Sequence, residues 1–140
     1  MTDEALPSMV ELKIPSKPEY VGVARLTILG VASRMPFSYD EVEDIRLAVG
    51  EACTTAVERA RKSNRLETEI TIRSEISGGK LSINVEDQAG PMSDGKLPAE
   101  SPSELDEQGL GALLMELLVD EFNVQSTPDG TVVHMVKYSG

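Results

Sequence analysis

Apolar and polar positions alternate with a period of two in five segments of the chain, a pattern that predicts β-strands with one buried face. These segments cover residues 9–14, 69–76, 80–87, 121–126 and 131–138. Ser-Gly-Gly at 77–79 and Pro-Asp-Gly at 128–130 are rich in turn-forming residues. Each is therefore expected to close a hairpin between the strands that flank it.

Apolar residues recur at three- and four-residue spacing in three other segments, which predicts helices at about 18–33, 39–61 and 109–119. Ser16 and Ser38 are each followed three positions later by a glutamate, Glu19 and Glu41. Both of the first two helices are therefore expected to begin with a capping box. The third segment is so rich in leucine that we expect its helix to be well buried.

The predicted order of elements is β-α-α-β-β-loop-α-β-β. It indicates an α/β protein of the α+β kind, a two-layer sandwich whose mixed, mostly antiparallel sheet carries helices on one face. The 140 residues are expected to form a single domain over 1–140. Residues 86–107 hold seven acids against Lys96, with several glycines and prolines, so about 88–108 is expected to be a flexible acidic loop. It is interpreted either as a functional lid or as a solvated insertion.

The charge of the chain narrows the classes of partner. Asp and Glu total 24 against 13 Lys and Arg, a formal net charge of −11, which argues against direct nucleic-acid binding and against an anionic membrane surface. No apolar run approaches the roughly 20 residues of a membrane span, and the first residues lack a signal-peptide pattern. The single cysteine, Cys53, suits a reducing compartment, so a cytoplasmic location is expected.

Glu51 and Thr55 lie one turn apart on the second predicted helix, on the side away from its apolar stripe. Positions of this kind usually form a solvated face. Alternatively, Glu51 overlooks a site in which its carboxylate orients water or takes a proton from a substrate hydroxyl. The spacing by itself leaves both interpretations open.

Two further features carry possible chemistry. Asp87 ends a predicted strand, either as a turn former or as an acceptor for the exocyclic amine of a base. Gly109 and Gly111 open the third helix, where each glycine costs about 1 kcal/mol relative to alanine. They form either a flexible junction or a phosphate site built from free helix amides. Cys53 lies on an apolar stripe and is interpreted as a core residue, and the lone His134 argues against a zinc site.

Taken together, these features resemble the GHKL ATPase family, and more closely its small anti-sigma-factor serine kinases of the RsbW type. The resemblance rests on Glu-Ala-Cys-Thr-Thr-Ala-Val at 51–57, Asp87 at a strand end, the long loop and Gly-Leu-Gly at 109–111. It extends over nearly the whole chain, including Pro-Glu-Tyr-Val-Gly at 18–22 and Leu-Met-Glu at 114–116. It implies a Bergerat-type fold with ATP or ADP in a pocket covered by the loop.

The resemblance also implies an activity and a set of site residues. It describes an ATP-dependent serine kinase that inhibits a bacterial stress-type sigma factor and phosphorylates a serine of a STAS-type anti-anti-sigma protein. Glu51 would be the catalytic base, Thr55 would stand at the Mg²⁺ ligand, and Asp87 would accept the adenine amine. The remaining nucleotide contacts that it implies are Ala89, Gly90, Gly109, Leu110 and Gly111.

A homodimer is implied in the same way. Ile28, Leu29 and Met35, near the end of the first helix, are expected to be exposed and to contribute to the surface between the two copies.

Three positions depart from the family pattern. Thr55 replaces a magnesium-binding asparagine, Ala89 replaces a glycine, and Arg59 replaces a common histidine. A threonine hydroxyl is a weaker Mg²⁺ ligand than an amide carbonyl, and alanine resists the positive φ that glycine allows. The alternative function is therefore a non-catalytic anti-sigma binding module with a degenerate nucleotide site. A third hypothesis is an unrelated two-layer protein without a nucleotide or sigma partner.

Overall fold

A five-stranded antiparallel sheet forms one layer of the molecule. The computed structural model describes residues 8–90 and 107–139. The strands are β1 (Ser8–Pro15), β2 (Glu69–Ser77), β3 (Lys80–Asp87), β4 (Glu121–Ser126) and β5 (Thr131–Tyr138). They are arranged in the order β1-β2-β3-β5-β4, with every neighbouring pair antiparallel. The expected strands and both hairpins are confirmed.

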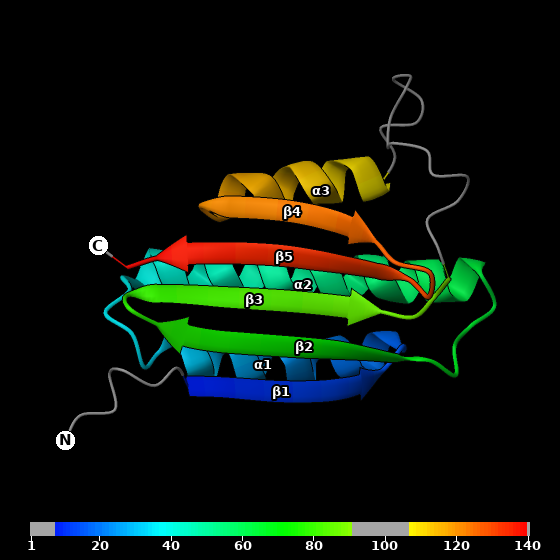
Figure 1. Cartoon of the computed structure of the whole chain (residues 1–140), viewed down its shortest axis with the longest axis horizontal. Coiled ribbons are helices and arrows are strands. Elements are labelled where there is room, and N and C mark those ends of the chain that lie inside the picture. The colour runs from blue at the N-terminus through cyan, green and yellow to red at the C-terminus, as the bar shows by residue number, and fades with distance from the viewer. Residues whose placement is uncertain (1–7, 91–106, 140) are drawn as a thin grey trace.

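Helices form the second layer, on one face of the sheet (Figure 1). A short 3-10 turn, η1 (Pro18–Tyr20), leads into α1 (Val21–Ala32), which packs beside the long helix α2 (Tyr39–Lys62). The third helix, α3 (Glu107–Leu118), packs against α2 and lies on the β4 side of the sheet. The expected two-layer α+β sandwich is therefore confirmed.

The two expected capping boxes have different outcomes. Ser38 caps α2 as expected, because its hydroxyl accepts from the Glu41 amide at 3.1 Å and its own amide donates to the Glu41 carboxylate at 2.7 Å. The box expected at Ser16 is wrong, since Lys17 precedes η1 and no side chain caps it. Ser16 is instead buried, with its amide bonded to the carbonyl of Thr68 just before β2.

The hydrophobic core lies between the sheet and the helices. Its fully buried members come from every layer: Ile14, Ile28, Ile45, Val49, Ile70, Leu81, Ile83 and Met135. Two residues expected to be exposed for a homodimer surface belong to this core, because Ile28 is 1% exposed and Met35 is 8% exposed. That expectation was wrong, since these side chains point from α1 and its C-terminal turn toward the sheet and α2.

Helix α3 is less buried than expected. Met115 is buried among core residues, and Val119, just after the helix, is buried as well. The leucines at 110, 113, 114 and 117 are exposed, with Leu117 reaching 76%. The expectation failed because α3 contacts one neighbouring helix and the edge strand β4, so only one stripe of a helix that is apolar on several sides finds a partner.

The other face of the sheet is polar. Arg73 on β2 bridges Glu11 on β1 at 2.8 Å and Glu86 on β3 at 3.6 Å, and Asn84 pairs with His134 across β3 and β5. This alternation of an apolar and a polar face matches the period-two pattern of the strands. Within the described ranges, no helix is both long enough and apolar enough to span a bilayer. The acidic loop expected at about 88–108 falls mostly outside the described residues.

Candidate functional site

Three polar side chains follow one another along α2 on successive turns. Glu51, Thr55 and Arg59 are spaced by four residues, so they share one side of the helix. The helix rise places the first and the last about 12 Å apart. Glu51 and Thr55 are half-buried, and the Arg59 side chain is largely buried. The interpretation of this side as a merely solvated face is therefore not sufficient, because the helix presents a partly enclosed row of polar groups.

The Glu51 end of this row meets α3. A Cβ built on Gly111 would collide with the Glu51 carboxylate, so the carboxylate occupies the space that a side chain at 111 would need. Both glycines predicted at the helix start lie in the N-terminal half of α3. The close approach of the Glu51 carboxylate explains why a glycine is suited to position 111, which the sequence alone could not show. The structure thus brings two of the expected site residues, Glu51 and Gly111, into contact.

The N-terminal end of α3 has the features of an anion site in part. Gly109 and Gly111 belong to its first turns, where free amides attract phosphate oxygens, although the Glu51 carboxylate fills the space beside Gly111. Leu110 between them is 56% exposed and points away from the core. It can contribute its backbone to such a site without a change in packing.

Asp87 forms the other end of the site. Its side chain is buried at the end of β3, and one carboxylate oxygen accepts from the amide of Ala89 at 3.0 Å. Burial raises the pKa of Asp87, while the Arg59 guanidinium and the amides of Ala89 and Thr131 act in the opposite direction. Gly130, just before β5, packs against this corner, since a Cβ there would overlap the Asp87 carbonyl. Asp87 is therefore a fixed acceptor in a well-packed corner.

Ala89 and Gly90 line the same corner. Ala89 is buried, and Gly90 adopts a φ of 95°, a conformation that glycine tolerates and other residues rarely adopt. The glycine displaced by one position therefore supplies the turn, and Ala89 requires no positive φ. The Arg65 guanidinium lies 3.6 Å from the position that a Cβ of Gly90 would occupy.

Arg59 joins the α2 row to the Asp87 corner. Its guanidinium donates to Oδ2 of Asp87 at 2.9 Å, to the Thr131 hydroxyl at 2.5 Å and to the Gly90 carbonyl at 2.8 Å. Sequence reasoning singled out Arg59 only as a departure from the family and missed Thr131 entirely. The available signal was position: Asp87 and Thr131 stand opposite each other in the β3–β5 register, but the pairing of those strands was not readable from the sequence.

The described donors fit a magnesium ion only in combination with a nucleotide. Among the described residues, no three or more acidic, histidine or cysteine side chains are grouped so that they could hold a metal ion. Mg²⁺ is commonly held by one or two protein oxygens together with substrate phosphates and water. Glu51 and Thr55, one turn apart, can supply such a partial set. For the nucleotide itself, the buried carboxylate of Asp87 could accept from a base, and the glycines of α3 could approach phosphates. In this structure Arg59 donates a hydrogen bond to that carboxylate.

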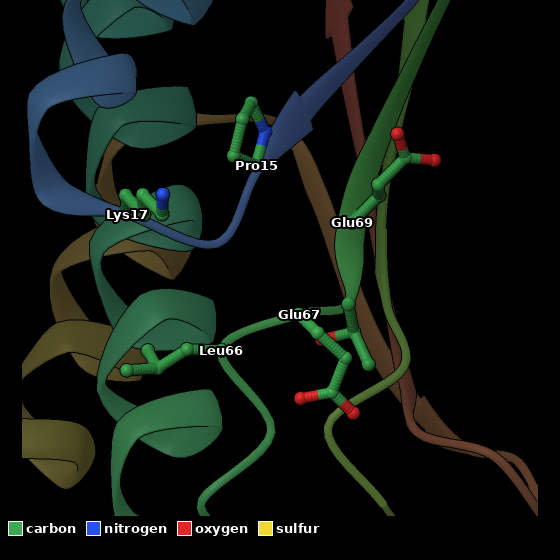
Figure 2. A pocket seen from close by; sticks show the side chains of 6 residues that line it. Pro15, Lys17, Leu66, Glu67 and Glu69 are labelled. Carbon is green, nitrogen blue, oxygen red and sulfur yellow. The ribbon is translucent and has the colours of Figure 1, made fainter.

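The remaining candidates carry no site. Cys53 is buried in the core as expected, and burial raises the pKa of its thiol to about 12. His134 Nδ1 lies 2.6 Å from the Asn84 side-chain oxygen on the polar face of the sheet. A hollow of about 420 Å³ lies beside the end of β1 and the α2–β2 loop (Figure 2). Its lining includes Lys17, Leu66 and Glu67 but none of the site residues, so it is separate from the site.

Comparison with known proteins shows which family the chain belongs to. A family model described as a histidine kinase-like ATPase domain matches residues 14–137. The serine-protein kinase RsbW of Bacillus licheniformis is 42% identical over 141 residues, covering 92% of this chain and 84% of the relative. The RsbW of Bacillus subtilis is 43% identical with the same coverage.

Solved structures show the same fold. The structure of the RsbU and RsbW domains from Mycobacterium tuberculosis gives a TM-score of 0.70 at 16% identity and covers 94% of this chain. The histidine kinase domain of a blue-light activated histidine kinase from Erythrobacter litoralis gives 0.58 at 24% identity and covers 89%. This chain spans 32% of the former and 61% of the latter. At these identities the likeness concerns the fold.

The fold and the family match over residues 14–137 define a class: the chain belongs to the histidine kinase-like ATPase family. Its relatives at 42–43% identity place it among the RsbW serine-protein kinases. The resemblance drawn from the sequence motifs is thereby confirmed.

Proposed function

We propose that the protein is an ATP-dependent serine kinase and anti-sigma factor that works by partner switching. The observation that carries the proposal is the continuity of the site. Glu51 against Gly111 at one end and the buried Asp87 at the other are joined by a single side of α2. This arrangement occurs in a chain 42–43% identical to proteins named serine-protein kinase RsbW.

Each residue has a role that its chemistry allows. Asp87 would accept the amine of adenine, Ala89 and Gly90 would border the base, and the backbone of Gly109, Leu110 and Gly111 would approach the phosphates. Bound ATP would supply the transferred phosphoryl group, with its charge offset by Mg²⁺. The Glu51 carboxylate would take the proton from the attacking serine hydroxyl, and Thr55 would hold the magnesium through its hydroxyl or a water.

The partners follow from the family. A sigma factor and a STAS-type anti-anti-sigma protein are the proposed alternatives for one binding surface, and the active form is proposed to be a cytoplasmic homodimer. The net charge of −11 supports protein partners with basic surfaces, since complementary charge favours association. Direct contact with nucleic acid or a membrane has no part in the proposal.

Two observations favour a second function, a non-catalytic anti-sigma module. Oδ2 of Asp87 already accepts a hydrogen bond from Arg59, and the residue at the position expected to bind magnesium is a threonine, Thr55. Both features weaken a nucleotide site and leave the fold intact. In that case the protein would inhibit its sigma factor by contact alone.

Phosphotransfer to candidate STAS-domain proteins tests the main proposal. With radiolabelled ATP and Mg²⁺, the native protein is expected to label its partner, and Glu51→Gln is expected to lower the rate by roughly 100-fold or more, because the general base is lost. Glu75→Gln removes an exposed carboxylate from the polar face of the sheet and serves as the matched control. Equal rates for Glu51→Gln and the native protein would contradict the proposal.

Thr55→Asn separates the two functions. If the native site is degenerate, an asparagine there should raise nucleotide affinity or turnover in the presence of Mg²⁺, because its amide carbonyl is the better ligand. Thermal unfolding with ADP, with and without Mg²⁺, measures this directly, since ligand at 100 times its Kd stabilises by about 2.7 kcal/mol. An unchanged response in a protein that already transfers phosphate would argue against the non-catalytic alternative.

A further inference from the structure

The Arg59 guanidinium is held by more acceptors than an exposed arginine on a helix usually finds. It contacts a carboxylate on β3, a hydroxyl on β5 and the carbonyl of Gly90, at 2.9, 2.5 and 2.8 Å. The side chain is 15% exposed and its carboxylate partner only 6%. Bonds of this kind, charged and withdrawn from water, are the stronger hydrogen bonds of proteins.

The two carboxylate oxygens of Asp87 accept hydrogen bonds from different donors. Oδ1 accepts from the amide of Ala89, which fixes the carboxylate in the β3 turn. Oδ2 accepts from Arg59. The amide of Thr131 also acts on this carboxylate. A base amine that approaches Oδ2 meets an oxygen already bound by the guanidinium, and because the carboxylate is only 6% exposed, we treat the amine and Arg59 as competitors for it.

We propose that Arg59 sets the nucleotide affinity and base selectivity of this site by acting as an internal competitor for Asp87 Oδ2. The inference rests on the proposed function, because it takes Asp87 as the acceptor of the adenine amine. An adenine nucleotide then binds only after the guanidinium has left Oδ2. The apparent affinity is lowered by the fraction of molecules in which that has happened.

The expected effect runs against simple electrostatics. Removing a cation near an anionic ligand should weaken binding, whereas removing a competitor should strengthen it. Arg59→Met keeps an unbranched apolar side chain, shorter than that of arginine, and removes every donor. Because a charge-assisted hydrogen bond no longer has to be broken, ADP is expected to bind roughly 10- to 100-fold more tightly to this variant.

Base selectivity provides a second readout. Inosine diphosphate presents a carbonyl in place of the adenine amine, so at that position of the ring it cannot donate to Asp87. The gain in Arg59→Met is therefore expected for ADP and not for inosine diphosphate. A general opening of the pocket would increase both affinities equally.

The experiment is isothermal titration of ADP and inosine diphosphate into the native chain, Arg59→Met, Arg59→Lys and Asp87→Asn, with EDTA present so that Thr55 and magnesium do not contribute. Arg61→Met is the matched control, since it removes a more exposed cation from the same helix that pairs with Glu58. Circular dichroism verifies folding. Should Arg59→Met fail to fold, Arg59→Lys decides, because one ammonium cannot bridge three acceptors and a smaller gain for ADP is expected.

The outcomes are distinct. Tighter ADP binding in Arg59→Met, with inosine diphosphate and Arg61→Met unchanged, supports the inference. If ADP binds the native chain and Asp87→Asn weakens it, while Arg59→Met binds no more tightly, the inference is overturned and the proposed function stands. If no variant binds ADP, both are overturned.

Discussion

At the scale of single residues, Gly111 and Gly130 restrict the site in different ways. At Gly111 a methyl group would meet the end of the Glu51 side chain, which can rotate. We expect Gly111→Ala to leave the thermal stability almost unchanged, because alanine also favours the helix by about 1 kcal/mol. Phosphotransfer should fall by roughly 10-fold or more, because the displaced carboxylate is the proposed base. Calorimetry and the phosphotransfer assay measure the two effects, and retained activity would contradict the role of the contact.

Gly130→Ala gives the opposite pattern. Here the added methyl would meet the backbone carbonyl of Asp87, which cannot move without shifting the strand. The free energy of unfolding is expected to fall by about 1–3 kcal/mol, as for other overpacked positions. Chemical denaturation measures this, and a stability equal to that of the native chain would show that the strands separate more easily than this packing implies.

The buried thiol of Cys53 makes the stability of the fold depend on pH. Burial raises the pKa of its thiol from 9.0 to about 12, so the unfolded thiol ionises first as pH rises. Its contribution to stability is complete below pH 9 and is lost between about pH 9 and 12, at up to 1.36 kcal/mol per pH unit. We expect the native chain to resist a thiol reagent at mildly alkaline pH and to react after unfolding. Cys53→Ala should show a shallower loss of stability over that pH range.

The sequence was sufficient to predict where Glu51, Asp87 and Gly111 lie, because each occupies a fixed place in a helix or at a strand end. It could not predict their contacts. The three hydrogen bonds of Arg59 require that β3 lies next to β5 and that the arginine side chain on α2 reaches both strands. These contacts depend on tertiary structure. The Ser16 capping box failed for the same reason, since Thr68 offered the buried serine a partner from a distant segment.

At the scale of elements, α3 has one firmly packed stripe and one exposed stripe. Met115 is 3% exposed, whereas Leu117 is 76% exposed on the same helix. Met115→Ala is expected to cost about 2–5 kcal/mol, the usual range for a large core side chain. Leu117→Gln should change stability by no more than about 0.5 kcal/mol. Urea denaturation of the two variants compares them, and a large loss for Leu117→Gln would contradict the observed exposure.

The positions of the strands and helices could be predicted from hydrophobic periodicity. Buried residues recur at every second position in a strand and at every third or fourth position in a helix. The strands at 80–87, 121–126 and 131–138 were predicted to the residue. The burial of α3 was not, because a leucine-rich segment shows how apolar a helix is and not how many neighbours it has. The same limit applied to Ile28 and Met35, whose orientation depends on the crossing of α1 with α2.

At the scale of the whole molecule, the charge dominates behaviour in solution. A net charge of −11 opposes non-specific association of molecules at neutral pH, and the sequence isoelectric point is about 4.5. Solubility is expected to pass through a minimum near that pH, because repulsion vanishes where the net charge does. Turbidity measured across the acidic range tests this. A minimum near neutral pH would instead point to association through the exposed leucines of α3.

The strand order described above has a consequence for how the chain folds. The β2–β3 and β4–β5 pairs close over short turns, whereas β1 reaches β2 only across α1 and α2, so that Ile14 meets Ile70. Closing a long loop costs chain entropy before its contacts repay it. The two hairpins are therefore expected to form early and locally, whereas the β1–β2 and β3–β5 pairings, which both join distant segments, are expected to form later.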